Sequence, residues 1–256
     1  MWQEHLRDRQ LGLISFGGAF DPARPGLLCV HGSGGRGDEF SLLLEALGEA
    51  ANSAALDLPG HGATPGPGRQ SVADYAAWVA DFLAAGPVRP WLLGHSLGGA
   101  IALTVALERP ELLGGLVLWG TGARLKVLPA ILEGLAQHFL PTVELLVDLA
   151  YAPATDPAIK DLGRRAMAAS EPQVLWGDYF SCDHFDVMAG LGSITLPTLV
   201  VCGQEDRLTP PKYSQFLAGR IPGARLAVIP RAGHMLHQEE PLAAAQALAG
   251  FLAGRG

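Results

Sequence analysis

Short apolar runs alternate along this chain with segments in which apolar residues recur every three or four positions. Most of the runs lack a polar face, which is typical of parallel strands covered by helices on both sides. They occupy residues 13–16, 27–30, 53–58, 91–93, 116–119, 198–202 and 225–229. The alternation predicts an α/β fold with a mostly parallel, doubly wound sheet, in which residues 13–16 form an edge strand.

The segments between these runs have helical spacing. Predicted helices cover residues 40–49, 71–83, 99–107, 212–221 and 242–252. In the second of them Val72, Tyr75 and Val79 share one face, which is expected to pack against the sheet. Ser71 and Asp74 form a capping box at its start.

The alternation stops near residue 120 and resumes near residue 196. The intervening residues have helical patterns interrupted by Pro129, Pro141, Pro153, Pro157 and Pro172. Because a single crossover uses far fewer residues, we expect residues 122–192 to form a helical cap over the functional edge of the sheet. This cap is inserted into a core domain of residues 1–121 and 193–256 and is not expected to fold alone. The alternative is a further set of ordinary sheet-covering helices.

Composition and charge narrow the classes of function. The formal net charge is −7 and the Lys and Arg residues are scattered, which argues against a nucleic-acid partner. The first residues do not resemble a secretory signal, and no apolar run approaches the length of a membrane span. Cys29 and Cys202 lie in predicted strands, and with Cys182 they form no spaced framework. A reduced, cytoplasmic protein without a membrane partner is expected.

A G-x-S-x-G motif, made by Gly94, Ser96 and Gly98, lies between a predicted strand and a predicted helix. In such a turn the serine backbone is strained and the glycines let strand and helix approach closely. The helix also directs its unpaired N–H groups, beginning with Leu97, toward negative charge beside the serine hydroxyl. The motif predicts Ser96 as a nucleophile and Leu97 N–H as an oxyanion donor. The alternative is an ordinary glycine-rich turn that carries a serine.

A serine nucleophile needs a base, and the base needs an acid to orient it. His234 follows the last predicted strand and would emerge at the same sheet edge as Ser96, whereas His237 is expected to be a surface or packing residue. Asp206 follows the preceding strand and is the predicted acid. The chain order is then Ser, Asp, His, the order of the α/β-hydrolases. Other carboxylates considered for this role are Glu205, Asp183 and Asp186.

Two glycine-containing loops lie at the same predicted edge. His31 and Gly32 begin the first loop, which carries Ser33, whose backbone N–H is the predicted second oxyanion donor. His31 and His61 are expected to brace these loops, and His31 and Gly32 also to line the substrate pocket. The first loop lacks the lysine and the spacing of a phosphate-binding motif.

The end of the predicted cap, residues 176–186, combines aromatic and acidic residues. We expect Phe180 and Phe185 to roof the pocket above Ser96 and to limit it to small or medium acyl groups. In the alternative interpretation these rings, together with Trp176, attach the cap to the core.

Taken together, these motifs resemble those of α/β-hydrolase superfamily serine hydrolases. They are residues 31–32 (HG), 57–62 (DLPGHG), 94–99 (GHSLGG), 203–206 (GQED) and 233–234 (GH). The sequence is most similar to carboxylesterases, 3-oxoadipate enol-lactonases and pimeloyl-carrier-protein methyl ester esterases. The resemblance implies an enzyme that cleaves a small or medium carboxylic ester or lactone through an acyl-serine intermediate. It implies no metal and no organic cofactor, and a monomer or homodimer.

Other functions on the same scaffold stay open at this point. A serine at the nucleophile position disfavours the reactions of haloalkane dehalogenases and epoxide hydrolases, which use an aspartate. Cofactor-free haloperoxidases and carbon–carbon bond hydrolases share the serine triad. A non-catalytic small-ligand-binding protein would not need all three triad groups, and a lipase would need a long apolar lid that the sequence does not show.

Overall fold

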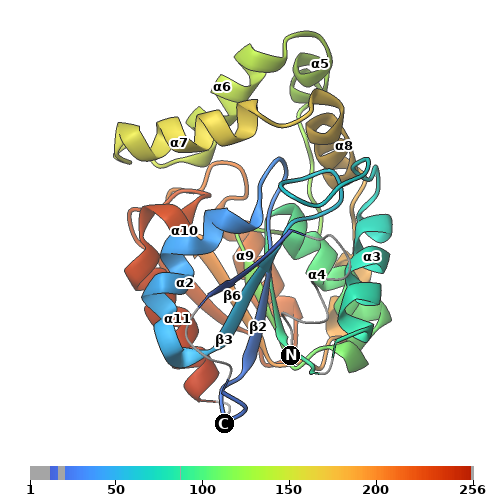
Figure 1. The fold of residues 1–256 in the computed structure, drawn as a ribbon, viewed down its shortest axis with the longest axis vertical. Helices are drawn as coiled ribbons and strands as arrows, with labels where there is room; N and C mark the ends of the chain where they lie inside the picture. Colours follow the sequence, from blue (N-terminus) through green and yellow to red (C-terminus); the bar gives the residue numbers. More distant parts are fainter. Residues whose placement is uncertain (1–11, 17–20, 87, 255–256) are drawn as a thin grey trace.

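The computed structural model describes residues 12–16, 21–86 and 88–254, and in this part seven strands form one sheet (Figure 1). The strands are β1 (Leu13–Phe16), β2 (Gly26–Val30), β3 (Asn52–Leu56), β4 (Trp91–His95), β5 (Gly115–Trp119), β6 (Thr198–Gly203) and β7 (Arg225–Ile229). Their order is β1-β3-β2-β4-β5-β6-β7, and only β1 runs antiparallel to its neighbour. The predicted α/β fold with a mostly parallel sheet is therefore confirmed, with residues 13–16 at an edge.

Helices cover both faces of the sheet. The elements outside the segment between β5 and β6 are η1 (Gly37–Phe40), α2 (Ser41–Leu47), η2 (Gly48–Ala50), α3 (Val72–Ala84), α4 (Leu97–Glu108), η3 (Pro110–Leu112), α9 (Pro211–Arg220), α10 (Leu236–Glu239) and α11 (Pro241–Ala253). Successive strand residues point to opposite faces, so Leu92 packs in the core under α3 and α4, while Leu93 packs in the core under α2 and α11. The sheet thus has one hydrophobic core on each face, which confirms the predicted doubly wound arrangement.

Local chemistry sets several element boundaries. Ser71 caps α3 by accepting the N–H of Asp74, as predicted. The strand expected to reach residue 58 ends at residue 56, because the carboxylate of Asp57 accepts the N–H groups of Gly37 and Ala63 and turns the chain into a loop. Gly48, at φ 55°, ends α2 before residue 49.

Residues 122–192, all of which are described, contain helices and no strand. The elements are α5 (Pro129–Gln137), α6 (Phe139–Ala150), α7 (Pro157–Ala168), α8 (Pro172–Asp183) and η4 (Met188–Ser193). Helices α5–α8 lie together above the sheet, at the top of Figure 1. Pro129, Pro157 and Pro172 stand at the first position of a helix, where the missing N–H costs nothing. Three of the five expected interruptions are therefore helix starts, whereas Pro141 lies in the first turn of α6 and Pro153 lies between α6 and α7.

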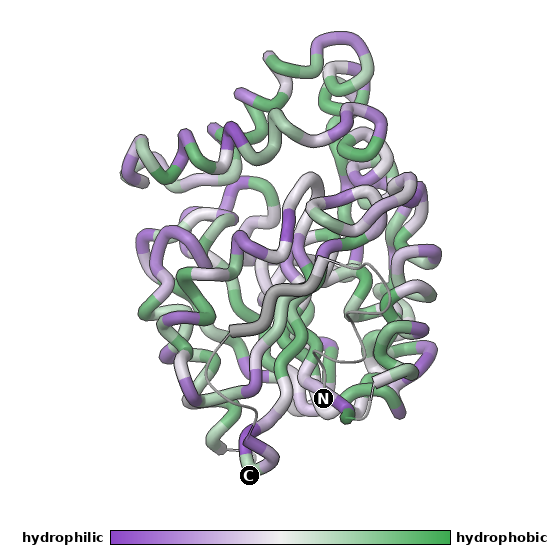
Figure 2. The backbone as a smooth tube through the Cα atoms, in the orientation of Figure 1, coloured by the Kyte–Doolittle hydropathy of each residue, from purple (hydrophilic) through white to green (hydrophobic). Residues whose placement is uncertain are grey.

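Hydrophobic residues gather in the strands and in the helices that cover them (Figure 2). Helix α7 carries more hydrophilic residues, and none of its residues is fully buried. In the ranges that the structure describes, no helix is both long enough and apolar enough to cross a membrane.

Candidate active site

Ser96 forms the turn between β4 and α4, at the end of the strand in the middle of the sheet. Its backbone has φ 53° and ψ −116°, a region that residues other than glycine rarely adopt. A Cβ atom on Gly94 would collide with the backbone of Gly98, and one on Gly98 would collide with the carbonyl of Val30. The motif therefore needs both glycines for close approach of strand and helix, as the sequence predicts. The N–H of Leu97 has no acceptor among the described residues.

His234 lies in the loop after β7 and contacts Asp206, which follows β6. Nδ1 of His234 is 2.8 Å from Oδ2 of Asp206, and both side chains are at least 95% buried. The Asp206 carboxylate also accepts the N–H of Leu208 and the N–H and hydroxyl of Thr209. Burial alone would raise the pKa of Asp206, but His234 and the Thr209 hydrogen bonds lower it below the usual value. The ionised carboxylate can therefore accept a hydrogen bond from the N–H at Nδ1 of His234, which leaves Nε2 without a proton and available as a base.

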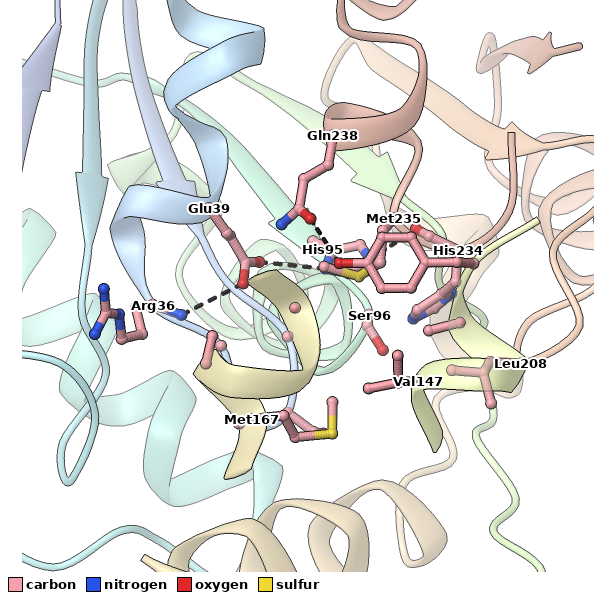
Figure 3. A pocket seen from close by; sticks show the side chains of 18 of the residues that line it. Arg36, Glu39, His95, Ser96, Val147, Met167, Leu208, His234, Met235 and Gln238 are labelled. Atoms are coloured by element: carbon pink, nitrogen blue, oxygen red, sulfur yellow. Dashed lines mark hydrogen bonds and ion pairs between the residues drawn. The ribbon is translucent and has the colours of Figure 1, made fainter. Parts of the chain in front are cut away.

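Ser96 and His234 line the same cavity, shown in Figure 3. No hydrogen bond joins the Ser96 hydroxyl to His234 among the described contacts, and in enzymes without substrate such bonds are often long and tighten only on binding. The competing carboxylates lie elsewhere. Glu205 is exposed, Asp183 pairs with Lys126, and Asp186 pairs with Arg124.

The loop after β2 carries Ser33 beside Ser96. The N–H of Ser33 has no acceptor among the described residues, and its hydroxyl lies 3.7 Å from the Cys182 thiol of α8. The next residue, Gly34, donates its N–H to Oδ2 of Asp178 at 2.9 Å. A side chain from α8 thus holds the loop that presents the Ser33 N–H.

Asp178, which the sequence interpretation did not single out, is fully buried at this junction. Besides Gly34 N–H, its carboxylate contacts Nε2 of His61 at 2.9 Å and accepts the Tyr75 hydroxyl at 2.7 Å. Nδ1 of His61 lies 3.1 Å from the carbonyl of Pro59, so both ring nitrogens face acceptors and the ring is an imidazolium. Burial lowers the pKa of His61, but the hydrogen bond and charge of Asp178 outweigh it and raise the pKa. No local pattern of the sequence marked Asp178, because its partners lie 103 to 144 residues away in the chain.

His31 braces the same loop but borders neither of the two described cavities that Ser96 lines. Its Nδ1 contacts the carbonyl of Gly32 at 2.8 Å, and its Nε2 accepts the N–H of Leu58 at 3.0 Å, so the ring is neutral. Burial lowers the pKa of His31 to about 3. The expectation that His31 lines the pocket is therefore wrong, because its ring bonds to two loops, whereas Gly32 does line the pocket.

Two further histidines pack behind the serine turn. Nε2 of His95 lies 3.1 Å from the carbonyl oxygen of His234. The ring of His237 is fully buried, 5.0 Å from the ring of Phe40, so it is a packing residue and not a surface one. Burial lowers the pKa of both imidazoles, that of His237 to about 3.

Two cavities meet at Ser33 and Ser96. The smaller one, of about 70 Å³, is bordered on one side by polar side chains: Arg36, Asp38, Glu39, His95, Tyr151 and Gln238 (Figure 3). The larger one, of about 230 Å³, has a mainly apolar lining that includes Leu125, Val127, Leu128, Ile131, Leu149 and Tyr213. An ester group at Ser96 would therefore have a small space on one side and a larger space on the other, and both spaces have a mainly apolar lining.

The structure does not bring Phe180 and Phe185 to either cavity. Phe185 is buried in the core beneath α3 and α4, and Phe180 stacks on Trp176, with ring centres 4.9 Å apart. Tyr179 and Cys182, three residues apart on one face of α8, line the cavities instead. The predicted pocket roles of the two phenylalanines are wrong, because Phe180 lies off the cavity-facing side of α8 and Phe185 follows that helix and packs into the core.

Comparisons with known proteins identify the family. A model described as alpha/beta hydrolase fold matches residues 25–241. A pimeloyl-[acyl-carrier protein] methyl ester esterase of Neisseria meningitidis serogroup B is 31% identical over 222 residues, which cover 80% of this chain and 84% of the relative.

Solved structures agree with this match. The structure of a thermophilic esterase is 34% identical, with a TM-score of 0.83, and the alignment covers 96% of this chain and 99% of the other. The enol-lactonase from Burkholderia xenovorans LB400, at 19% identity and a TM-score of 0.87 over 95% and 96% of the chains, is similar in fold alone. Because the family model spans most of the sequence and the relatives align over nearly their whole length, this chain belongs to the α/β hydrolase fold family.

Proposed function

We propose that this carboxylic ester hydrolase cleaves a small or medium ester or lactone through an acyl-Ser96 intermediate. The observation that carries the proposal is the 2.8 Å contact between Asp206 Oδ2 and His234 Nδ1, beside a cavity that both His234 and Ser96 line. An ionised, buried carboxylate holds the imidazole with Nδ1 protonated, so Nε2 is the basic nitrogen.

In the first half-reaction Nε2 of His234 accepts the proton of the Ser96 hydroxyl while the oxygen attacks the ester carbonyl. The resulting imidazolium gives that proton to the leaving alcohol, and the acyl group stays on Ser96. In the second half-reaction His234 takes a proton from water, which attacks the acyl-serine, and then returns it to Ser96. Asp206 stabilises the imidazolium in both.

The N–H groups of Ser33 and Leu97 are the proposed donors to both tetrahedral oxyanions. Two observations support this assignment. Neither N–H has an acceptor among the described residues, and Ser33 lies in the loop after β2 while Leu97 begins α4 directly after Ser96. Each such donor contributes on the order of 3 kcal/mol to transition-state binding in other acyl-transfer enzymes.

We assign substrate selection to residues 122–192, acting as a cap. Helices α5, α6 and α8 contribute Ile131, Leu149, Tyr179 and Cys182 to the larger cavity. The relative from Neisseria is named for a methyl ester, and this arrangement suits such a substrate, with the apolar acyl chain in the larger cavity and a small alcohol group in the smaller one.

The proposal is tested with a fluorophosphonate probe and a series of chromogenic esters and lactones. Ser96→Ala should abolish labelling and lower kcat by roughly 10⁶, whereas Ser193→Ala, which alters an exposed hydroxyl, should change neither. Asp206→Asn should lower kcat on the order of 10⁴, while Glu205→Gln should have little effect. Appreciable turnover by Ser96→Ala would refute the nucleophile, and ligand binding without any turnover by the wild type would indicate a binding protein.

A further inference from the structure

Three ionisable side chains converge behind the Ser96 turn: Glu39 of η1, His95 at the end of β4, and His237 of α10. Glu39 Oε1 lies 3.5 Å from Nδ1 of His95 and 3.7 Å from Nε2 of His237. One potential ligand atom from each residue lies within 4.8 Å of the other two. The two imidazoles are at least 97% buried and the Glu39 side chain is 10% exposed. The proposed hydrolysis uses none of these groups.

Several buried atoms of these three side chains have no hydrogen-bond partner in the described chain. They are Oε1 of Glu39, Nδ1 of His95 and both ring nitrogens of His237. Nε2 of His95 lies 3.1 Å from the carbonyl oxygen of His234, and because a carbonyl only accepts, Nε2 carries the proton of the ring. Its Nδ1 then points at a carboxylate oxygen 3.5 Å away, a separation longer than an ordinary N–H···O hydrogen bond. A cation between these buried atoms would satisfy them, and the separation leaves room for an ion larger than a proton.

We propose that Glu39, His95 and His237 bind a divalent transition-metal ion of the zinc type. Two imidazole nitrogens and one carboxylate oxygen suit Zn²⁺, whereas Ca²⁺ and Mg²⁺ prefer oxygen ligands alone. In a tetrahedral site with bonds of about 2.0–2.2 Å, neighbouring ligand atoms are about 3.4 Å apart. The two distances from Glu39 Oε1, 3.5 and 3.7 Å, are close to that separation.

The surroundings of the three residues also suit an ion. The hydrogen bond from His95 Nε2 to the carbonyl of His234 fixes the tautomer, as a second hydrogen bond does for most metal-binding histidines. The other carboxylate oxygen of Glu39 accepts the N–H of Arg36 at 3.4 Å. Glu39 and His95 border the smaller cavity beside Ser96, which gives an entry path and room for water as a fourth ligand (Figure 3).

The expected effect of the ion is reversible inhibition, and this part of the inference rests on the proposed function. The ring centres of His95 and His234 are 4.7 Å apart. A divalent ion with one carboxylate ligand leaves a net positive charge there. Because His234 must become an imidazolium in both half-reactions, a nearby positive charge disfavours each transition state. Zn²⁺ should therefore slow acylation of Ser96, and a chelator should restore it.

Binding is tested by calorimetric titration of ZnCl₂ into the chelator-treated, dialysed full chain, with MgCl₂ as the comparison. One Zn²⁺ site and no Mg²⁺ site are expected. Glu39→Gln should weaken Zn²⁺ binding by at least about 100-fold, because it removes a ligand and its charge. It should not lower the metal-free melting temperature, since the new amide N–H can donate to Nδ1 of His95. His184→Gln, which removes an exposed imidazole at the end of α8, should leave zinc binding and basal activity unchanged.

His237→Gln is the second ligand variant, for use if Glu39→Gln does not fold. The absence of a zinc site in the wild type, or a site of equal affinity in the folded ligand variants, would overturn the proposal. Zinc binding at this site without slower fluorophosphonate labelling would overturn the inhibitory role. Failure of the proposed hydrolysis is distinguishable, because labelling would then be absent in metal-free protein while calorimetry still reports the ion.

Discussion

Asp178 offers the sharpest test of how the proposed cap and the proposed active site depend on each other. Its carboxylate joins α8 to three parts of the core, through Gly34 N–H, the His61 ring and the Tyr75 hydroxyl, and it has no exposed surface. Asp178→Ala would leave three buried donors without an acceptor. In Asp178→Asn the remaining oxygen can still accept from Gly34 N–H and the His61 ring, which both contact Oδ2 in the wild type. The new amide N–H then faces the Tyr75 hydroxyl. This variant therefore mainly removes the negative charge that pairs with His61.

The magnitudes follow from these contacts. Removing one member of a buried charged pair costs about 3–5 kcal/mol, so Asp178→Ala should lower the unfolding free energy by about 4 kcal/mol. Asp178→Asn should cost about 2 kcal/mol, the difference between charged and neutral hydrogen bonds at one oxygen. The kcat of Asp178→Ala should fall by about 10- to 100-fold, because the Gly34 N–H bond holds the neighbouring Ser33 N–H, the proposed oxyanion donor.

Urea unfolding and ester hydrolysis, both measured well below the melting temperature, test these values. The matched control is Asp161→Asn, which alters a partly exposed cap carboxylate paired with two arginines, and it should change stability by less than about 1 kcal/mol. If Asp178→Ala loses about 4 kcal/mol of unfolding free energy but keeps its kcat, the contact only attaches α8 to the core. A loss below about 1 kcal/mol would refute the reasoning from burial altogether.

Two further outcomes are expected. Burial lowers the pKa of His31 in the folded protein to about 3, whereas the ring has its ordinary, higher pKa in the unfolded chain. At a pH between these two pKa values unfolding takes up a proton, so the free energy of unfolding falls as the pH drops. Urea titrations from about pH 6 to about pH 4 in the presence of a chelator should show that His31→Gln flattens this dependence by about 1.4 kcal/mol per pH unit; an unchanged slope would contradict the neutral ring. Ile131→Phe should fill part of the larger cavity and shift the preference along an acetate-to-decanoate ester series toward shorter chains by about 1–3 kcal/mol. Phe180 borders neither cavity, so Phe180→Ala should leave that preference unchanged. A shift of preference in Phe180→Ala and none in Ile131→Phe would show that Phe180, and not Ile131, contacts the acyl chain.

The sheet could be predicted from the sequence because each central strand is a short apolar run between loops. All seven predicted runs correspond to strands, with differences of a few residues at their ends. One such difference is at Asp57, whose hydrogen bonds to Gly37 and Ala63 come from other loops and leave no periodic pattern in the sequence. Boundaries set by tertiary hydrogen bonds are not visible in hydrophobic periodicity.

The strained turn at Ser96 was predictable for a different reason. A strand, a serine between two glycines and a helix leave few conformations open to the backbone, so the local sequence alone determines the turn. The proximity of His234 to Asp206 followed from topology, since the carboxyl ends of neighbouring parallel strands meet at one edge. Their catalytic roles stay predictions until the variants are measured.

The pocket could not be predicted to the same depth, because it depends on how the helices of residues 122–192 are rotated over the sheet. In α8 a shift of one residue exchanges Phe180 for Tyr179 at the cavity, and the sequence of this helix has almost no amphipathic bias to fix the rotation. The rotation is set by Asp178, whose partners are 103 to 144 residues distant in the chain. Long-range pairing of this kind has no signature in a single sequence.

This dependence on α8 links specificity to catalysis in the proposed enzyme. Tyr179 and Cys182 line the cavities, while Asp178, on the same helix, holds the loop that presents the Ser33 N–H. The contact between the Ser33 hydroxyl and the Cys182 thiol adds a second connection between helix and loop. A substitution that rotates α8 to reshape the pocket would therefore also move an oxyanion donor. Ile131 of α5 and Leu149 of α6 also line the larger cavity, but no described hydrogen bond joins them to that loop. Substitutions at these two positions should therefore change substrate preference with a smaller loss of kcat.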